Sequence, residues 1–148
     1  MRLNLGCGKN KLDGYYNIDI SNKANCDLVA DLSKGIPLPD NCAEEVLCKH
    51  FIEHIADIIF IMNEIWRVCK NDAKVRIIVP HQDSPMAFAD PTHKRIFNEE
   101  SFKYYCSNGE HYCIHEIYGI KCNFLLVSQT VKKDKRHREI DIILKAIK

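Results

Sequence analysis

The first twenty residues place the strongest constraint on the fold. Residues 2–5, "RLNL", are typical of a short β-strand, and the run breaks immediately into Gly6-Cys7-Gly8. Glycine has no Cβ, so a strand that enters Gly-x-Gly can turn sharply and bring its backbone close to a ligand. A second β-rich run, "YYNIDI" at 15–20, follows too soon for a parallel crossover helix, which usually needs a dozen or more residues. We therefore expect a loop or a single turn between these strands.

The rest of the chain alternates between short β-rich runs and helical patterns, which indicates an α/β sheet. Apolar residues recur at helical spacing over 55–70 and predict an amphipathic helix there. The other predicted elements are strands at 26–32, 43–50 and 74–80, a short helix over 99–106 capped by Asn98, and a terminal β-hairpin from "IKCNFLLVSQTV" and "REIDIILKAIK". No repeat or linker divides residues 1–148, so we expect a single domain.

The connection at 81–97 is long for so small a domain and contains two prolines without a clear period. Long ordered loops often bind ligands or close over them, although a plain surface loop fits the same pattern. Its polar side chains are therefore candidates for a site.

Charge and hydropathy argue against several classes of protein. The chain carries 21 lysines and arginines against 20 aspartates and glutamates, so its net charge gives no argument for a nucleic-acid or membrane partner. No apolar run is long enough to span a bilayer, and Met1 leads into a strand without a signal-peptide pattern. We expect a cytoplasmic protein that acts on a small molecule.

Eight cysteines raise the question of disulfides or zinc. Four of them lie in or beside apolar segments, where cysteine packs as a small core residue. These are Cys7, Cys48, Cys69 and Cys122. Without a secretory signal, we expect reduced thiols. The cluster Cys106, His111, Cys113 and His115 matches no paired Cys-x-x-Cys spacing, so metal binding there stays open and no metal ligand is assigned.

One interpretation of Gly-x-Gly after a strand is the dinucleotide-binding fingerprint Gly-x-Gly-x-x-Gly. Its third glycine would fall at Lys11, and its acidic residue should lie about 20 residues further on, whereas Asp19 arrives much sooner. A nicotinamide site therefore fits poorly.

A different family matches much better. "LNLGCG", "NIDI", "VADL" and "IPLPDNCAEEVLCKHFIEHI", in this order, resemble the small class I S-adenosylmethionine-dependent methyltransferases of the type 11-like group. The resemblance continues through "IMNEIWRVCKNDAKVRIIVPH" and "DPTHKRIF", and so covers most of residues 2–105. It implies a Rossmann-like three-layer sandwich with a mostly parallel seven-stranded sheet, an antiparallel last strand and a reduced first helix. It also implies S-adenosyl-L-methionine as the cofactor.

The chemistry of that cofactor suits the first two strands. Amides of the Gly6–Gly8 turn can donate to its amino-acid end, and Asp19 can accept from both ribose hydroxyls. The resemblance places Asp31 near the adenine amino group and Leu32 against the ring. The expected cofactor-binding residues are Leu5, Gly6, Cys7, Gly8, Asp19, Ile20, Asp31, Leu32 and His50. The alternative for both carboxylates is that each only caps a turn.

Methyl transfer needs alignment of the nucleophile, and a general base only where the acceptor is protonated. The candidates for proton transfer are, in order, His81, His93 and His50, because these follow strand ends or lie in the long loop. Each could equally well only hydrogen-bond a loop or the cofactor. The candidates for orienting a substrate are Asp83, Asp90 and Arg95.

The acceptor is left open by the sequence, with oxygen or nitrogen expected. No Asn/Asp-Pro-Pro-Tyr/Phe follows the fourth strand, which disfavours amino methylation by that motif. The hairpin turn is basic and should project beside the ligand crevice, where it could attract an anionic small molecule, although a solvated hairpin tip fits the same pattern. Without interleaved aromatic residues, single-stranded nucleic acid is less favoured. The turn comprises Lys132, Lys133, Lys135, Arg136, His137 and Arg138.

Two other functions stay open. The chain could be a non-catalytic S-adenosylmethionine-binding module in a complex, and a homodimer would cover its apolar tail strands. A zinc metallohydrolase would use His50, Glu53 and His54, which match His-x-x-Glu-His. That chemistry needs both histidines on one helical face, whereas His50 should end a strand, so we disfavour it.

Overall fold

The computed structural model describes residues 1–134 and 137–148. The strands are β1 (Arg2–Leu5), β2 (Tyr16–Asp19), β3 (Leu28–Val29), β4 (Ala43–Lys49), β5 (Cys69–Pro80), β6 (Phe124–Lys133) and β7 (Arg138–Ala146). The α-helices are α1 (Ile58–Val68) and α2 (Pro85–Ala89). Short 3-10 helices are η1 (Leu32–Lys34), η2 (Ile52–His54), η3 (Lys103–Tyr105) and η4 (Tyr112–Ile114).

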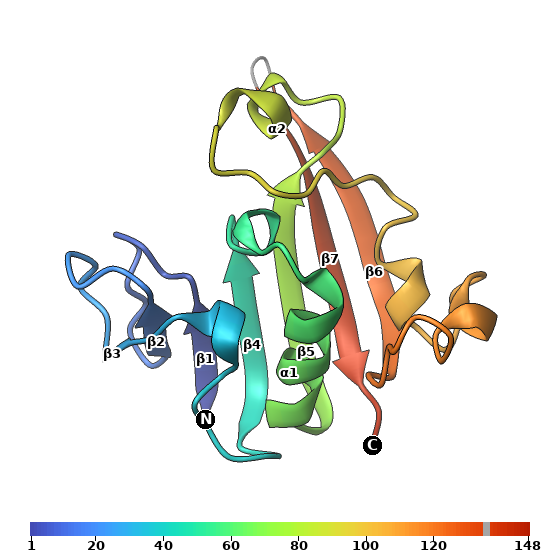
Figure 1. Cartoon of the computed structure of the whole chain (residues 1–148), viewed down its shortest axis with the longest axis horizontal. Helices are drawn as coiled ribbons and strands as arrows, with labels where there is room; N and C mark the ends of the chain where they lie inside the picture. Colours follow the sequence, from blue (N-terminus) through green and yellow to red (C-terminus); the bar gives the residue numbers. More distant parts are fainter. Residues whose placement is uncertain (135–136) are drawn as a thin grey trace.

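All seven strands form one mixed sheet in the order β3-β2-β1-β4-β5-β7-β6 (Figure 1). Strands β1 to β5 pair in parallel, and β7 runs antiparallel to both of its neighbours. This confirms the expected Rossmann-like sheet and its antiparallel last strand. The carboxyl ends of the parallel strands therefore meet at one edge, below the loop that carries α2 (Figure 1).

The reduced first helix is also confirmed, but the covering layers are thinner than a three-layer sandwich implies. Residues 6–15 and 20–27, which join β1 to β2 and β2 to β3, are all described and contain no helix. Both connections are too short for a crossover helix, so they cross as loops. Helix α1 covers one face of the sheet (Figure 1). On the opposite face, β5, β6 and β7 carry a charged network in which Arg76 and Lys132 both bind Asp141.

Three expected elements differ in length, for local reasons. The strand expected at 26–32 shrinks to Leu28–Val29 because Asp27 turns back to accept from the backbone and side-chain nitrogens of Asn17, both at 2.9 Å. The helix expected over 99–106 is only the 3-10 turn η3, whose cap position is Phe102 rather than Asn98. Asn98 instead accepts from the Glu100 amide at 3.0 Å in the turn before η3. Strand β5 begins at Cys69, earlier than the predicted residue 74.

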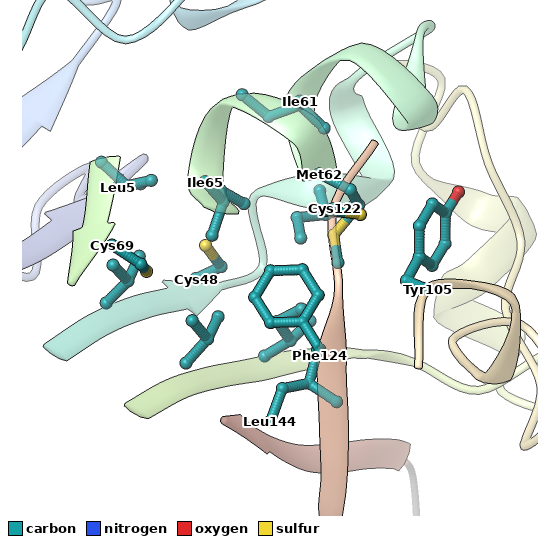
Figure 2. Packing of buried hydrophobic residues seen from close by; sticks show 14 of the residues in the cluster. Leu5, Cys48, Ile61, Met62, Ile65, Cys69, Tyr105, Cys122, Phe124 and Leu144 are labelled. Carbon is teal, nitrogen blue, oxygen red and sulfur yellow. The ribbon is translucent and has the colours of Figure 1, made fainter. Parts of the chain in front are cut away.

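The core lies between α1 and the sheet (Figure 2). Asp57 caps α1 by accepting from the Phe60 amide at 2.9 Å, and the helix buries Ile61, Met62, Ile65 and Val68. All eight cysteines are free thiols, as expected. Burial raises the pKa of Cys69 to about 12, so this thiol behaves as a core side chain.

The Asp141 network gives a stability prediction. The Arg76 guanidinium, with help from Lys132, lowers the pKa of the 9% exposed Asp141 carboxyl to about 2. A depressed carboxyl pKa stabilises the native state above pH ~4 and loses that effect as pH falls through ~2; here it amounts to about 2 kcal/mol at neutral pH. We expect Asp141→Asn to lower the free energy of unfolding by about 1–2 kcal/mol at pH 7, as measured in denaturant titrations.

The gap between wild type and this variant should narrow as pH falls from about 4 to 2. Asp72→Asn is the matched control, because Asp72 binds Lys145 at the exposed surface and should contribute less than about 1 kcal/mol. A gap that stays constant down to pH ~2 would contradict this account.

Candidate functional site

Two cavities meet at the carboxyl edge of the sheet. The strand-end cavity has a volume of about 470 Å³ and lies over the ends of β1 and β2. It is lined by Gly6, Gly8, Asp19, Ile20, Ala30, Asp31, Leu32, Ser33, His50, Phe51, His54 and Ile55. The loop cavity has a volume of about 320 Å³. It is lined by His50, Glu53, His54, Pro80, Ser84, Met86, Asp90, His93, His137, Arg138 and Glu139. His50 and His54 line both cavities and therefore mark their junction.

The glycine turn after β1 has the backbone that the sequence predicts. Gly6 and Gly8 adopt φ of +65° and +52°, in the left-handed region that favours glycine. A Cβ on Gly6 would lie 2.5 Å from the Phe51 ring, so no other residue fits there. Gly8 instead faces open space at the cavity.

Asp19 holds this turn in place. Its Oδ2 accepts from the Gly8 amide at 2.7 Å, and its Oδ1 accepts from the Ser21 amide at 2.9 Å. The side chain lines the cavity although the residue is only 9% exposed. A carboxylate has about four acceptor sites, so each oxygen can still accept from a ligand hydroxyl.

All three amides of the glycine turn, which were expected to donate to the cofactor, already donate within the protein. The Gly6 and Cys7 amides both donate to the Ile18 carbonyl, at 2.9 and 3.2 Å, and the Gly8 amide is taken by Asp19. The turn therefore brings backbone close to the cavity without offering it these hydrogens. The contribution of the turn to the cavity is its tight backbone path, which glycine permits.

Two of the predicted cofactor residues lie outside the strand-end cavity. Leu5 is fully buried in the core, because every second residue of β1 faces α1. Cys7 instead lines a neighbouring hollow, which shares Gly6, Gly8 and His50 with the strand-end cavity. The sequence analysis also missed Ala30, Ser33, Phe51 and Ile55; their positions beside the predicted residues were the available signal.

Asp31 is placed where either of the roles considered for it could be performed, and only its capping role is visible in the structure. It lines the cavity and also caps η1, accepting from the Ser33 amide at 3.1 Å and from the Ser33 hydroxyl at 2.6 Å. These bonds, with Lys34 nearby, lower the pKa of its carboxyl. Leu32 and the 67% exposed Ile20 add apolar surface to the same cavity.

His50 ends β4 between two carboxylates. Its Nδ1 lies 3.3 Å from Glu53 Oε1, and its Nε2 lies 3.0 Å from Glu139 Oε1. Its φ of +53° is unusual for a residue with a side chain and turns the ring toward the junction of the cavities. The Glu53 hydrogen bond is the largest cause of a raised His50 pKa. Both nitrogens are occupied, which suits His50 to positioning rather than to accepting a proton.

His81, the first candidate for proton transfer, does not reach either cavity. The ring is 2% exposed, and its Nδ1 accepts from the Asp83 amide at 3.0 Å. Its Nε2 then donates to Glu99 Oε2 at 3.0 Å, and this bond lowers the pKa of Glu99. His81 is therefore a buried structural residue that joins β5 to the following loop.

His93 is placed differently. It lines the loop cavity, and its Nδ1 donates to the Ala87 carbonyl at 3.1 Å. Its Nε2 lies 3.8 Å from Asp90 Oδ2, beyond hydrogen-bond distance. Of the three predicted histidines, His93 is the one that keeps a ring nitrogen available in this cavity.

The residues predicted to orient a substrate divide in the same way. Asp90 lines the loop cavity. Asp83 instead binds Arg138 at 2.7 Å, and Arg95 donates twice to the Ala56 carbonyl, which ties the loop to the start of α1. From the basic hairpin turn, His137 and Arg138 line the loop cavity, whereas Lys135 and Arg136 lie outside the described residues.

Neither zinc pattern of the sequence assembles as written. His50 of the His-x-x-Glu-His motif contacts Glu139, whereas His54 contacts Thr92 Oγ1 at 2.9 Å, so the two rings serve different partners. In the second cluster, Cys106 is buried against the Phe102 carbonyl. His111 and His115 stack on Tyr104 and Tyr112. Within residues 1–134 and 137–148, that cluster forms no group of three converging ligands.

Residues 3–77, just over half of the chain, match the family described as a methyltransferase domain. The chain belongs to this family. The matched segment begins in β1 and ends within β5, so it contains the glycine turn, Asp19, Asp31 and His50. A search of the curated proteins found no match.

Solved structures show the same fold across nearly all of this chain. A S-adenosylmethionine-dependent methyltransferase from Methanosarcina mazei is 16% identical, with a TM-score of 0.65 over 98% of this chain and 91% of that one. One from Archaeoglobus fulgidus is 19% identical, with a TM-score of 0.62 over 97% and 84%. The [4+2]-cyclase SpnF is 11% identical, with a TM-score of 0.65 over 98% and 73%. Within the described part of the chain, no helix has the length and apolar character that a membrane crossing requires.

The His50 contacts predict an elevated titration midpoint. We expect the His50 ring to titrate above the ordinary histidine pKa of about 6.5 in NMR spectra, because Glu53 and Glu139 favour the charged ring. Glu53→Gln should lower that midpoint more than Glu139→Gln does, since Glu53 is the larger cause. Glu116→Gln, remote from both cavities, serves as the control. A wild-type midpoint below 6.5 would contradict the assignment.

Proposed function

We propose that this domain transfers a methyl group from S-adenosyl-L-methionine, bound in the strand-end cavity, to a small acceptor bound in the loop cavity. The two cavities share His50 and His54, so a group held in one lies next to a group held in the other. Family membership and the fold of the methyltransferase neighbours support the activity.

The observation that carries the proposal is the Asp19 carboxylate in the wall of the strand-end cavity. Both of its oxygens are held by backbone amides, which fixes them in position while leaving acceptor capacity for two ribose hydroxyls. Ile20 and Leu32 offer apolar surface for the adenine ring, and Asp31 can accept from its amino group. The Gly8 backbone leaves room for the amino-acid end.

In the reaction, the sulfonium–methyl bond breaks as a bond forms between the methyl carbon and an acceptor oxygen or nitrogen. S-adenosylhomocysteine leaves, and a neutral acceptor also loses a proton. The main contribution of the protein to this reaction is to align the acceptor atom with the methyl group across the junction. Of the histidines predicted for proton transfer, His93 is the one whose ring has a nitrogen available to the acceptor.

Arg138 supports an acceptor that carries a carboxylate or phosphate. It lines the loop cavity, and its Nε is buried without a hydrogen-bond partner among the described residues, although another nitrogen of the group binds Asp83. Glu53, Asp90 and Glu139 line the same cavity, so the anionic group would lie at the Arg138 side. An acceptor with separated polar ends fits this distribution of charge.

The donor site is tested by titration with S-adenosylhomocysteine in a calorimeter. We expect one equivalent to bind, and Asp19→Asn to weaken binding about 10- to 100-fold, because a hydrogen bond to a charged group is worth ~1.5–3 kcal/mol. Asp72→Asn, at the opposite edge of the sheet, should leave the affinity unchanged.

Asp19 also holds the glycine turn, so a second variant separates binding from folding. Ile20→Asp changes an exposed side chain of the same cavity and should weaken binding while the melting temperature stays close to wild type. No binding by the wild type, or wild-type affinity in both variants, would refute the donor site. Binding without methyl loss for any acceptor tried would favour the non-catalytic module.

A further inference from the structure

The side chains of Glu53, His54 and His93 converge at the junction of the cavities. Each offers one metal-ligating atom, and the three atoms lie within 4.8 Å of one another. Backbone hydrogen bonds hold the loop against η2 at this point, since the Lys94 and Arg95 amides both donate to the Glu53 carbonyl. Residues from two segments of the chain are thus brought together by the fold.

Glu53 is a buried acidic residue with one carboxylate oxygen that has no hydrogen-bond partner among the described residues. Its side chain is 1% exposed; Oε1 meets His50, but Oε2 is buried without a hydrogen-bond partner among the described residues. A buried acceptor atom without a partner costs more free energy than a paired one, and the cost is larger for a charged group. A cation beside Oε2 would remove this cost.

Hydrogen bonding prepares both histidines as ligands. The Thr92 hydroxyl donates to Asp90 Oδ1, so it can only accept from His54 Nδ1, which lies 2.9 Å away. His93 Nδ1 donates to the Ala87 carbonyl. In both rings the hydrogen is therefore on Nδ1, and Nε2 keeps its lone pair. Metal-binding histidines usually have this arrangement, in which the ring nitrogen that does not bind the metal donates to a carbonyl, a carboxylate or another hydrogen-bonded group.

We propose that Glu53, His54 and His93 bind a zinc ion. Two histidines and a glutamate are one of the ligand sets of zinc sites that keep a fourth position open. Bonds of about 2.1 Å in a tetrahedron place ligand atoms about 3.4 Å apart, so the most distant pair closes by no more than about 1.4 Å, within reach of small side-chain rotations.

The position of this site suggests a role for the ion in the proposed methyl transfer. This role, unlike zinc binding itself, rests on the proposed function. His54 and His93 line the loop cavity, so the open position of the ion would face the acceptor. A zinc-bound hydroxyl or thiol loses its proton at lower pH than the free group does. His93 would then act as a metal ligand, and the ion would prepare the acceptor in place of a histidine base.

Zinc binding is measured directly on the chelator-treated chain, without donor or acceptor. We expect competition against a chromophoric chelator, with elemental analysis after dialysis, to give one zinc per chain. His54→Ala and His93→Ala should each weaken binding by at least about 100-fold, because loss of an outer-shell partner alone costs 10–100-fold. Thr92→Val removes the hydroxyl that contacts both His54 and Asp90 but keeps all three proposed ligands, and should weaken binding about 10-fold.

His111→Ala and Cys113→Ala are the controls, since both belong to the separate cysteine–histidine cluster. They should leave zinc affinity unchanged. Cobalt(II) should give a visible absorption spectrum that His93→Ala alters and the controls do not. The proposal is overturned if no zinc is taken up, if uptake survives both histidine substitutions, or if it is lost in the controls instead. S-adenosylhomocysteine titration of the zinc-free chain keeps failure of this site distinct from failure of the donor site.

Discussion

The hydrogen bond between the Asp19 carboxylate and the Gly8 amide is the interaction on which the site depends. No helix follows β1 to hold the glycine turn, so side chains perform that task. Asn17, which is buried, also links these segments: its side-chain oxygen accepts from Asn4, and its side-chain nitrogen donates to Asp27. Strands β1 and β2 are therefore tied together by buried polar groups, and the cavity lies where these ties end.

The loop after β5 supplies the other half of the site by a similar use of polar contacts. His81 anchors its start between Asp83 and Glu99, and Arg95 anchors its end at the Ala56 carbonyl. Between these anchors, His93 is carried to η2. A chain with few helices thus forms a second cavity by fixing a long loop at both ends.

The sequence analysis was accurate where local pattern decides structure. Alternating apolar runs and the Gly-x-Gly turn indicated most of the strands, and the family resemblance indicated their mostly parallel sheet. Together they placed Asp19, Asp31 and His50 at one edge. It was wrong for His81, because proximity to a strand end does not reveal whether a ring points into a cavity or into the protein. It also treated His54 mainly as part of a motif with His50, whereas its partners come from residues 90–93.

The amino-acid order by itself determined that the chain forms an α/β sheet with a glycine turn too short for a helix, because hydrophobic periodicity and the absence of a Cβ act within a few residues. Only the tertiary structure decided which polar atoms remain available. The Gly6 and Cys7 amides both donate to the Ile18 carbonyl, whereas Glu53 Oε2 has no hydrogen-bond partner among the described residues although the fold brings Glu53 close to His54 and His93. Whether a polar atom is free or already hydrogen-bonded depends on contacts between distant segments. Residue type alone therefore does not reveal it.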